Sequence, residues 1–298
     1  MYKPVVLITG ASGFIGSHLL PYLLARDYQV IGVSRKAQPR THPNLSWVQQ
    51  FDELQLQSID YVINLAGESI AQGRWTAQRK QKLIQSRVRT TQALYQFLQR
   101  RQIFPKCILS GSAVGYYGID SAEQWQQVCT EESHGQAIFM SQLCQEWEQA
   151  ARADTAQHTK IMRLGVVFGH GGGILPQMLF PIKWNLVRRI GHGRQPVVWV
   201  HIQDVLRAME FILTQDTEQQ VFNVVAPEKV TQSQFAYIAA QSLKRHPILN
   251  MPAWVFKTLL GEQSQLILNG QFVQPQALKQ AGFEFKFPTL KEALNDLV

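Results

Sequence analysis

The chain has 298 residues and a formal net charge of +8 at pH 7; 45% of its residues are hydrophobic and 17% are charged. This balance is that of a folded globular protein and excludes a disordered chain. The sequence has no apolar run of about 18 residues, so we expect no membrane-spanning helix and no membrane partner. The positive charge is not gathered into a stripe with interleaved aromatic residues, so we expect no nucleic-acid partner either.

Three cysteines, Cys107, Cys129 and Cys144, occur without a C-x-x-C pair. The N-terminus does not have the pattern of an export signal, so we expect free thiols and a cytoplasmic location. The eight histidines are scattered and lack the spacing of a metal site, so no metal is expected.

Strand and helix patterns alternate over the first part of the chain. Short apolar runs predict strands, and helical spacing of apolar residues predicts helices. The predicted strands are 5–9, 29–34, 46–50, 60–66, 106–110 and 160–167, and the predicted helices are 13–25, 76–101 and 137–152. Such alternation is typical of a parallel sheet with helices on both faces. We therefore predict an α/β fold with a Rossmann-type, doubly wound parallel sheet.

The rest of the chain is less regular and predicts a smaller, mixed C-terminal lobe. Its expected strands are 197–201 and 221–225, and its expected helices are 174–189, 205–213, 231–243, 252–260 and 275–280. We place the first domain at 1–169, with 196–225 completing its sheet. The second lobe, on the substrate side, spans 170–298.

A glycine-rich loop joins the first predicted strand to the first predicted helix. It reads Thr9-Gly10-Ala11-Ser12-Gly13-Phe14-Ile15-Gly16. Glycines in this setting permit a tight turn and let backbone N–H groups approach a pyrophosphate, and the helix N-terminus adds partial positive charge. The loop therefore predicts a dinucleotide site, with contacts from Gly10, Ser12, Gly13, Phe14, Ile15 and Gly16.

The end of the second predicted strand indicates which dinucleotide is bound. NAD-specific proteins place a carboxylate there for the ribose 2′-hydroxyl, whereas this chain has Ser34 and Arg35. A serine hydroxyl and an arginine suit a 2′-phosphate. We therefore predict NADP(H), the alternative being that Arg35 is an ordinary surface charge.

The glycine spacing resembles that of the short-chain dehydrogenase/reductase superfamily, and Asn64-Leu65-Ala66-Gly67 resembles its Asn-Ala-Gly motif. The wider pattern resembles bacterial "epimerase family proteins", an atypical extended branch related to nucleotide-sugar epimerases. The resemblance covers nearly the whole chain and implies a Rossmann core, NADP binding and a small C-terminal lobe, but no substrate. Its further motifs are 68–70, 74–75, 86–87, 110–118, 165–167, 171–175, 191–195, 199–202 and 281–285.

The resemblance also implies roles for single residues. Ser34 and Arg35 should contact the 2′-phosphate, and the loop Leu65, Ala66, Gly67 and Glu68 should contribute to the cofactor site along the adenine and ribose. Arg87 should face the cofactor, and Val167 should lie near the nicotinamide. The alternatives are a helix-surface charge for Arg87 and a core position for Val167.

The usual catalytic residues of the superfamily are a serine, a tyrosine and a lysine, with tyrosine as the acid/base. Ser112 matches the serine, but Ile138 and Gln142 stand at the tyrosine and lysine positions. Tyr116 and Tyr117 are the nearest phenols, with packing as the alternative role for both. Further titratable candidates are His201, Asp204 and Glu68. The alternative for His201 is a buried, hydrogen-bonded structural role, and the alternative for Asp204 is to cap the following helix.

Two interpretations of function therefore remain open. The protein is either an NADP-dependent oxidoreductase or isomerase with relocated acid/base residues, or a catalytically inactive NADP(H) sensor. Arg188 and Arg189 favour an anionic small-molecule ligand; the alternative is a basic helix end. We expect a monomer or a homodimer.

Overall fold

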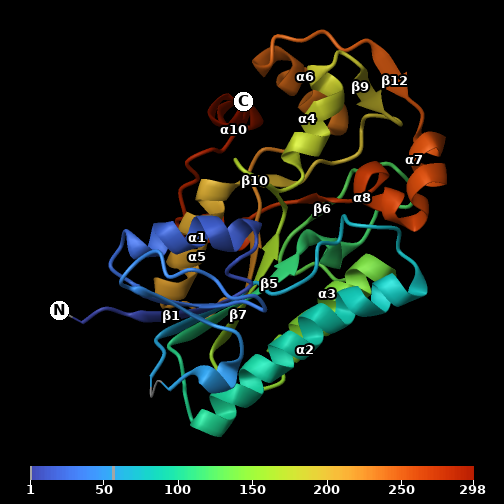
Figure 1. Cartoon of the computed structure of the whole chain (residues 1–298). Coiled ribbons are helices and arrows are strands. Elements are labelled where there is room, and N and C mark those ends of the chain that lie inside the picture. The colour runs from blue at the N-terminus through green and yellow to red at the C-terminus, as the bar shows by residue number, and fades with distance from the viewer. Residues whose placement is uncertain (1, 56–57) are drawn as a thin grey trace.

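A seven-stranded parallel sheet forms the centre of the molecule (Figure 1). The computed structural model describes residues 2–55 and 58–298. The strand order is β11-β7-β5-β4-β1-β2-β3, and each neighbouring pair is parallel. The predicted Rossmann-type sheet is confirmed. Its strands are β1 (Val5–Thr9), β2 (Gln29–Val33), β3 (Leu45–Val48), β4 (Tyr61–Asn64), β5 (Cys107–Ala113), β7 (Thr159–Leu164) and β11 (Val221–Val224).

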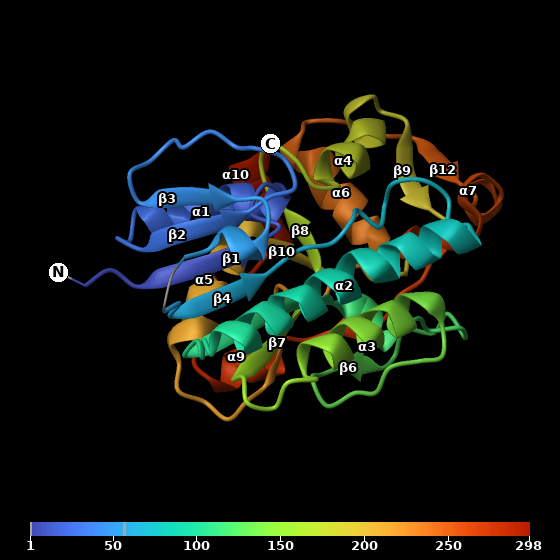
Figure 2. The same cartoon turned by 60° about the horizontal axis from the view of Figure 1, so that its bottom comes forward.

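Helices cover both faces of this sheet. They are α1 (Phe14–Leu24) and α5 (Ile202–Thr214) on one face, and α2 (Ala77–Arg101) and α3 (Phe139–Ala151) on the other. Figure 2 shows α2 and α3 side by side. The neighbouring strand residues Ile108 and Leu109 belong to different core clusters, because successive side chains of a strand point to opposite faces. Leu109 packs in the α1 and α5 cluster, and Ile108 packs with Leu94 of α2.

The order of connection reverses at the centre of the sheet. β1 pairs with β2 on one side and with β4 on the other. In open α/β sheets a ligand binds at such a switch point, outside the carboxyl ends of the strands. The loops that follow β1 and β4 therefore border the expected ligand crevice.

The strand expected over 160–167 is two strands, β7 and β8 (Val166–Phe168), separated by Gly165. A Cβ on Gly165 would lie 2.9 Å from the carbonyl oxygen of Val198, so the chain turns where backbones meet closely. β8 pairs with β10 (Trp199–His201) in a separate two-stranded sheet. Within 196–225, β11 alone joins the main sheet, so the expectation that the whole segment completes it is partly wrong.

The prediction of a helix over 174–189 is also wrong for the second half of that segment. α4 (Leu175–Lys183) ends early, and Asn185 has a φ of 57°, in the left-handed region that commonly stops helices. The chain continues as β9 (Val187–Ile190), which pairs with β12 (Leu249–Met251). Arg188 and Arg189 therefore lie on a strand, and their interpretation as a helix end is wrong.

The C-terminal lobe packs around its own core, which includes Phe168, Trp199, Phe235 and Leu290. In Figure 1 its elements α4, α6 (Gln232–Ser242), β9, β12 and α10 (Leu290–Leu297) lie at the top, with α2 and α3 at the bottom. Thr231 caps α6, since its hydroxyl accepts from the amide of Gln234. No helix of the described residues is long and apolar enough to cross a membrane. The remaining elements are η1 (Phe51–Glu53), η2 (Val114–Tyr117), β6 (Val128–Cys129), α6 (Gln232–Ser242), α7 (Ala253–Leu260), η3 (Gly261–Ser264), α8 (Gln265–Leu268), β13 (Phe272–Val273), α9 (Gln276–Gln280) and α10 (Leu290–Leu297).

Candidate functional site

The glycine loop closes tightly against the loop that follows β4. Gly10 has a φ of 69°, and a Cβ there would lie 2.8 Å from the carbonyl group of Leu65. A Cβ on Gly16 would lie 2.4 Å from the carbonyl oxygen of Ala11. No side chain within the described residues caps the N-terminus of α1, and Ser12 and Gly13 are exposed. The amides of the first turn are therefore available to an anionic ligand.

A buried hydrogen-bond network fixes the two loops relative to each other. The hydroxyl of Thr9 donates to Oδ1 of Asn64 at 2.6 Å and accepts from the amide of Ala66 at 3.2 Å. Nδ2 of Asn64 donates to the hydroxyls of Thr91 and Ser110 at 2.9 and 3.2 Å. Asn64 belongs to the stretch that resembles the Asn-Ala-Gly motif, whereas no motif indicated Thr91.

Ser34 and Arg35 lie at the end of β2, beside the glycine loop. The Ser34 hydroxyl is buried, lies 3.4 Å from the Ser12 hydroxyl and accepts from the amide of Lys36 at 3.3 Å. Arg35 is exposed and forms no ion pair within 2–55 and 58–298. A hydroxyl and an unpaired arginine thus follow one another at the strand end where a dinucleotide would present its adenine ribose.

Arg87 extends from α2 beneath the loop after β4. A Cβ on Gly67 would lie 3.0 Å from Cζ of Arg87, and Arg87 donates to the carbonyl oxygens of Glu68 and Leu83, each at 3.0 Å. Among the described residues no carboxylate pairs with this guanidinium, and its burial lowers the pKa of Arg87 from the ordinary value. Arginine still keeps its proton at neutral pH, so a desolvated cation lies under this loop.

Both carboxylate oxygens of Glu68 form ion pairs. Its two oxygens lie 2.5 Å from Nη1 of Arg79 and 3.2 Å from Nζ of Lys82. Hydrogen bonds from Arg79 and Lys82 hold the pKa of Glu68 below its usual range. Glu68 is therefore ionised at neutral pH and orders the loop by charge.

Phe14 connects the glycine loop to the C-terminal side. Its ring lies against the glycines of 169–173, since a Cβ on Gly172 would come within 2.7 Å of the ring. Ile15 and Val167 are partly buried and pack against the core cluster that α1 and α5 share. Val167 lies in β8, next to this glycine segment, so the structure brings it near the N-terminus of α1.

Ser112 belongs to a buried charge network. Its hydroxyl donates to Oε1 of Glu148 at 2.7 Å. Glu148 also accepts two hydrogen bonds from Arg163, both at 2.8 Å, and Nη1 of Arg163 donates to the Tyr117 hydroxyl at 3.0 Å. The Tyr117 hydroxyl donates to Oδ1 of Asn223 at 2.7 Å. All five side chains are buried. Because they come from different elements, their hydrogen bonds join β5, α3, β7 and β11.

The three predicted catalytic side chains, Ser112, Tyr116 and Tyr117, therefore differ in how exposed they are. Burial raises the pKa of Tyr117 to about 12, even though Arg163 beside it acts in the opposite direction. Tyr116 is half-buried, and its ring centroid lies 3.4 Å from Cζ of Arg163. Ile138 precedes α3, and Gln142 on α3 is exposed, so neither supplies an acid/base group.

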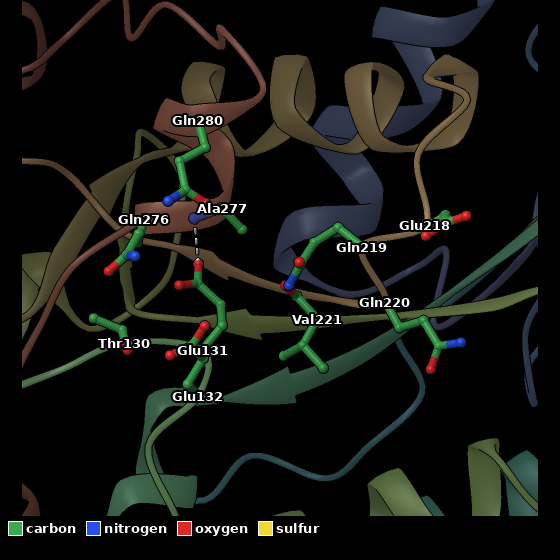
Figure 3. A pocket seen from close by; sticks show the side chains of 10 residues that line it. All are labelled: Thr130, Glu131, Glu132, Glu218, Gln219, Gln220, Val221, Gln276, Ala277 and Gln280. Carbon is green, nitrogen blue, oxygen red and sulfur yellow. Dashed lines mark hydrogen bonds between the residues drawn. The ribbon is translucent and has the colours of Figure 1, made fainter.

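Glu131 holds β11 and α9 together, a role that the sequence did not indicate. Its Oε1 accepts from the amides of Asn223 and Ala277 at 3.0 and 3.1 Å. Figure 3 shows Glu131 beneath α9, where it lines a pocket of about 310 Å³ with Glu132 and Glu218. The pocket adjoins the residues that lead into β11, at the amino ends of the strands. It is therefore separate from the glycine loop, which follows the carboxyl end of β1.

His201 and Asp204 serve the start of α5. The buried His201 accepts through Nδ1 from the amide of Gln203 at 3.1 Å. The carboxylate of Asp204 accepts from the amides of Lys286 and Phe287 at 2.7 and 2.9 Å. Both residues connect α5 to the C-terminal segment and neither lies in the glycine loop site.

The model of the NAD dependent epimerase/dehydratase family matches residues 6–225, which is most of the chain. The chain belongs to this family. A second family model, a domain of unknown function termed DUF1731, matches 251–297. The two matches confirm the resemblance seen in the sequence, including the C-terminal lobe of the epimerase family proteins.

Relatives of this family resemble the chain over its whole length. Epimerase family protein SSP1921 of Staphylococcus saprophyticus is 35% identical, with 98% of each chain covered. The crystal structure of human epimerase family protein SDR39U1 with NADPH is 33% identical, with a TM-score of 0.88 and 98% of each chain covered. UDP-glucuronic acid 4-epimerase of Bacillus cereus, solved with NAD, shares the fold at 17% identity, with a TM-score of 0.76 and 98% and 94% covered.

Proposed function

We propose that this family member binds NADP(H), with the 2′-phosphate at Ser34 and Arg35. The observation that carries the proposal is that Arg35, exposed and without an ion pair among the described residues, directly follows Ser34, whose hydroxyl lies 3.4 Å from that of Ser12. The human relative solved with NADPH supports it. A ribose 2′-hydroxyl would instead call for a carboxylate at this strand end, and Val33-Ser34-Arg35-Lys36 has none.

The remaining residues fit the rest of such a cofactor. The absent Cβ atoms of Gly10, Gly13 and Gly16 let the loop close tightly on its own backbone and on Leu65. The uncapped N-terminus of α1 would then bind the pyrophosphate. Leu65, Ala66 and Gly67 would border the adenine and ribose, Arg87 would add positive charge, and Val167 would border the nicotinamide. The bound nicotinamide would supply hydride chemistry.

We further propose that any turnover is an oxidoreductase or isomerase reaction on a small, anionic molecule. Of the three predicted catalytic residues, Tyr116 is the one whose phenol is not buried in a hydrogen-bonded network. Ser112 and Tyr117 are better suited to hold β5, α3 and β11 together, because their hydroxyls are already bonded to Glu148 and Asn223.

A second candidate is an NADP(H) sensor without turnover. The observation that favours it is the use of the Ser112 hydroxyl in an internal bond, combined with Ile138 and Gln142 where a tyrosine and a lysine would stand. Such a site would hold the cofactor without the proton relay of the superfamily.

One experiment separates the two candidates. Purified protein with NADPH is mixed with a panel of carbonyl compounds and nucleotide sugars, and the NADPH absorbance is followed. Consumption that falls by at least about tenfold in Tyr116→Phe, with NADPH affinity retained, supports the enzyme. Tight NADPH binding without consumption across the panel supports the sensor.

A further inference from the structure

The C-terminal lobe ends in a protruding apolar surface, here called the lobe tip. It consists of residues from the end of α4, from the segment between α4 and β9, and from the start of β12 with the residue before it, which lie together. The amide of Leu249 donates to the carbonyl oxygen of Leu186 at 2.8 Å, and the amide of His246 donates to Oδ1 of Asn185 at 2.7 Å. Its exposed side chains are Phe180 (58%), Trp184 (67%), Leu186 (44%), Ile248 (72%) and Leu249 (51%). Contiguous exposed apolar residues of this size mark an interaction surface.

A basic groove adjoins the lobe tip. It has a volume of about 990 Å³ and is lined by Arg188, Arg189, Lys244, Arg245 and His246. Ile248 lines the groove as well and so connects it to the lobe tip. None of the four arginines and lysines forms an ion pair with a described residue. The groove therefore carries uncompensated positive charge.

The two segments of the lobe that build the groove contain no acidic residue. No aspartate or glutamate occurs in 155–203 or in 229–261, the two segments that build α4, β9, α6, β12 and α7. The neighbouring α10 does carry Glu292 and Asp296. Glu292 caps its own helix through Thr289, and Asp296 lies 3.2 Å from His201, so neither lines the groove.

The combination of an apolar lobe tip with a basic groove argues against several kinds of partner. A symmetric contact with a second copy would bring arginines against arginines, which is repulsive. A nucleic acid would use aromatic and basic residues but leaves Ile248, Leu249 and Leu186 without a stacking role. A small soluble anion would fill the groove and leave the lobe tip in water.

An anionic phospholipid surface satisfies both features. We propose that the lobe tip and the basic groove dock this protein on an anionic phospholipid bilayer. The lobe tip enters the boundary between head groups and acyl chains, and the groove binds lipid phosphates. The expectation of no membrane partner considered spanning helices, whereas this contact is made on the surface. The elements α4, β9 and β12, which carry or border the lobe tip, lie at one end of the molecule (Figure 1).

The test uses sedimentation with vesicles of phosphatidylcholine alone or mixed equally with phosphatidylglycerol. We expect the full-length protein to sediment with the anionic vesicles and to be released by high salt. The double variant Lys244→Glu and Arg245→Glu should partition at least about tenfold more weakly, and so should Trp184→Ser with Ile248→Ser. Quenching of Trp184 fluorescence by brominated lipid, measured against Trp184→Phe, should report insertion of the lobe tip.

Matched controls keep the proposal falsifiable. Phe104 is 64% exposed and outside the lobe, so Phe104→Ser should sediment like wild type. The double variant Arg40→Glu and Lys279→Glu carries the same charge change on exposed sites outside the groove and should also bind. Thermal unfolding midpoints check that each variant is folded.

Four results would overturn the proposal. They are the absence of sedimentation with anionic vesicles, equal sedimentation of the groove and control variants, binding of a DNA oligonucleotide in place of vesicles, and binding of glycerol phosphate in the groove without any partition onto vesicles. The last result would assign the groove to a soluble anion.

Discussion

The hydroxyl of Ser112 donates a 2.7 Å hydrogen bond to the carboxylate of Glu148. The serine that matches the catalytic serine of the superfamily thus completes a buried ion pair between Glu148 and Arg163. Removing one partner of such a pair leaves an uncompensated charge in the interior. The relationship therefore makes predictions about stability that a purely catalytic serine would not make.

Glu148→Ala should lower the free energy of unfolding by about 3–5 kcal/mol, because it leaves the Arg163 guanidinium buried without its carboxylate. Urea denaturation measures the change. Glu146→Ala is the matched control, since Glu146 is exposed on the same helix, and it should change the free energy by less than about 0.5 kcal/mol. Equal effects of the two substitutions would contradict the structural role of Glu148.

The two neighbouring tyrosines should respond differently to loss of the hydroxyl. Tyr117→Phe leaves Oδ1 of Asn223 without its buried donor and should cost about 1–3 kcal/mol. Tyr116→Phe should cost less than about 0.5 kcal/mol, because that ring is half-buried. Chemical denaturation compares the two variants, and a larger loss in Tyr116→Phe would reverse their assigned roles.

The stability of the protein should fall at mildly acidic pH because of His201. Burial lowers the pKa of this imidazole from its ordinary value, although the carboxylates of Asp296 and Asp204 act in the opposite direction. Below about pH 6.5 the unfolded chain takes up a proton at this residue and the folded protein does not. The free energy of unfolding therefore decreases as the pH falls from about 6.5 toward the lower folded pKa, and His201 contributes no pH dependence above that window.

The variant His201→Asn isolates this effect, because asparagine can also cap α5. The difference in unfolding free energy between pH 7.5 and pH 5.5 should be smaller in the variant than in wild type. His134→Asn changes an exposed histidine and should leave the difference as in wild type. An unchanged pH dependence in His201→Asn would mean that another group titrates.

The three thiols should react slowly in the folded protein. Cys107, Cys129 and Cys144 are free and buried, and burial raises the pKa of both Cys107 and Cys144 to about 11. Since the thiolate is the reactive form, an aromatic disulfide reagent at pH 8 should modify them only slowly, and all three rapidly in denaturant. Fast labelling of the native protein would show that one of them is accessible.

Local features of the chain were the most predictable. The strand, glycine loop and helix at 5–25 could be identified from sequence because each feature is set by neighbouring residues. The position of Ser34 and Arg35 followed from the same local unit. The structure places the Ser34 hydroxyl 3.4 Å from that of Ser12, with Arg35 next along the chain.

Features set by distant residues were not predictable. The segment 187–190 has an apolar pattern that also fits a helix, and its strand depends on pairing with 249–251. The sequence likewise could not show that Ser112 meets Glu148, because α3 brings the carboxylate from 36 residues away. Single-sequence patterns report the face of an element but not which distant side chain lies opposite.

The most direct test of the central claim, that Ser34 and Arg35 select the 2′-phosphate, is calorimetric titration of the protein with NADPH and NADH. We predict tighter binding of NADPH, and an Arg35→Ala variant that binds NADPH about tenfold to a hundredfold more weakly while its NADH affinity is unchanged. Arg40→Ala, on an exposed arginine five residues further along the chain, should bind both as wild type does. Equal affinity of wild type for NADPH and NADH, or an Arg35→Ala variant that keeps full NADPH affinity, would contradict the claim.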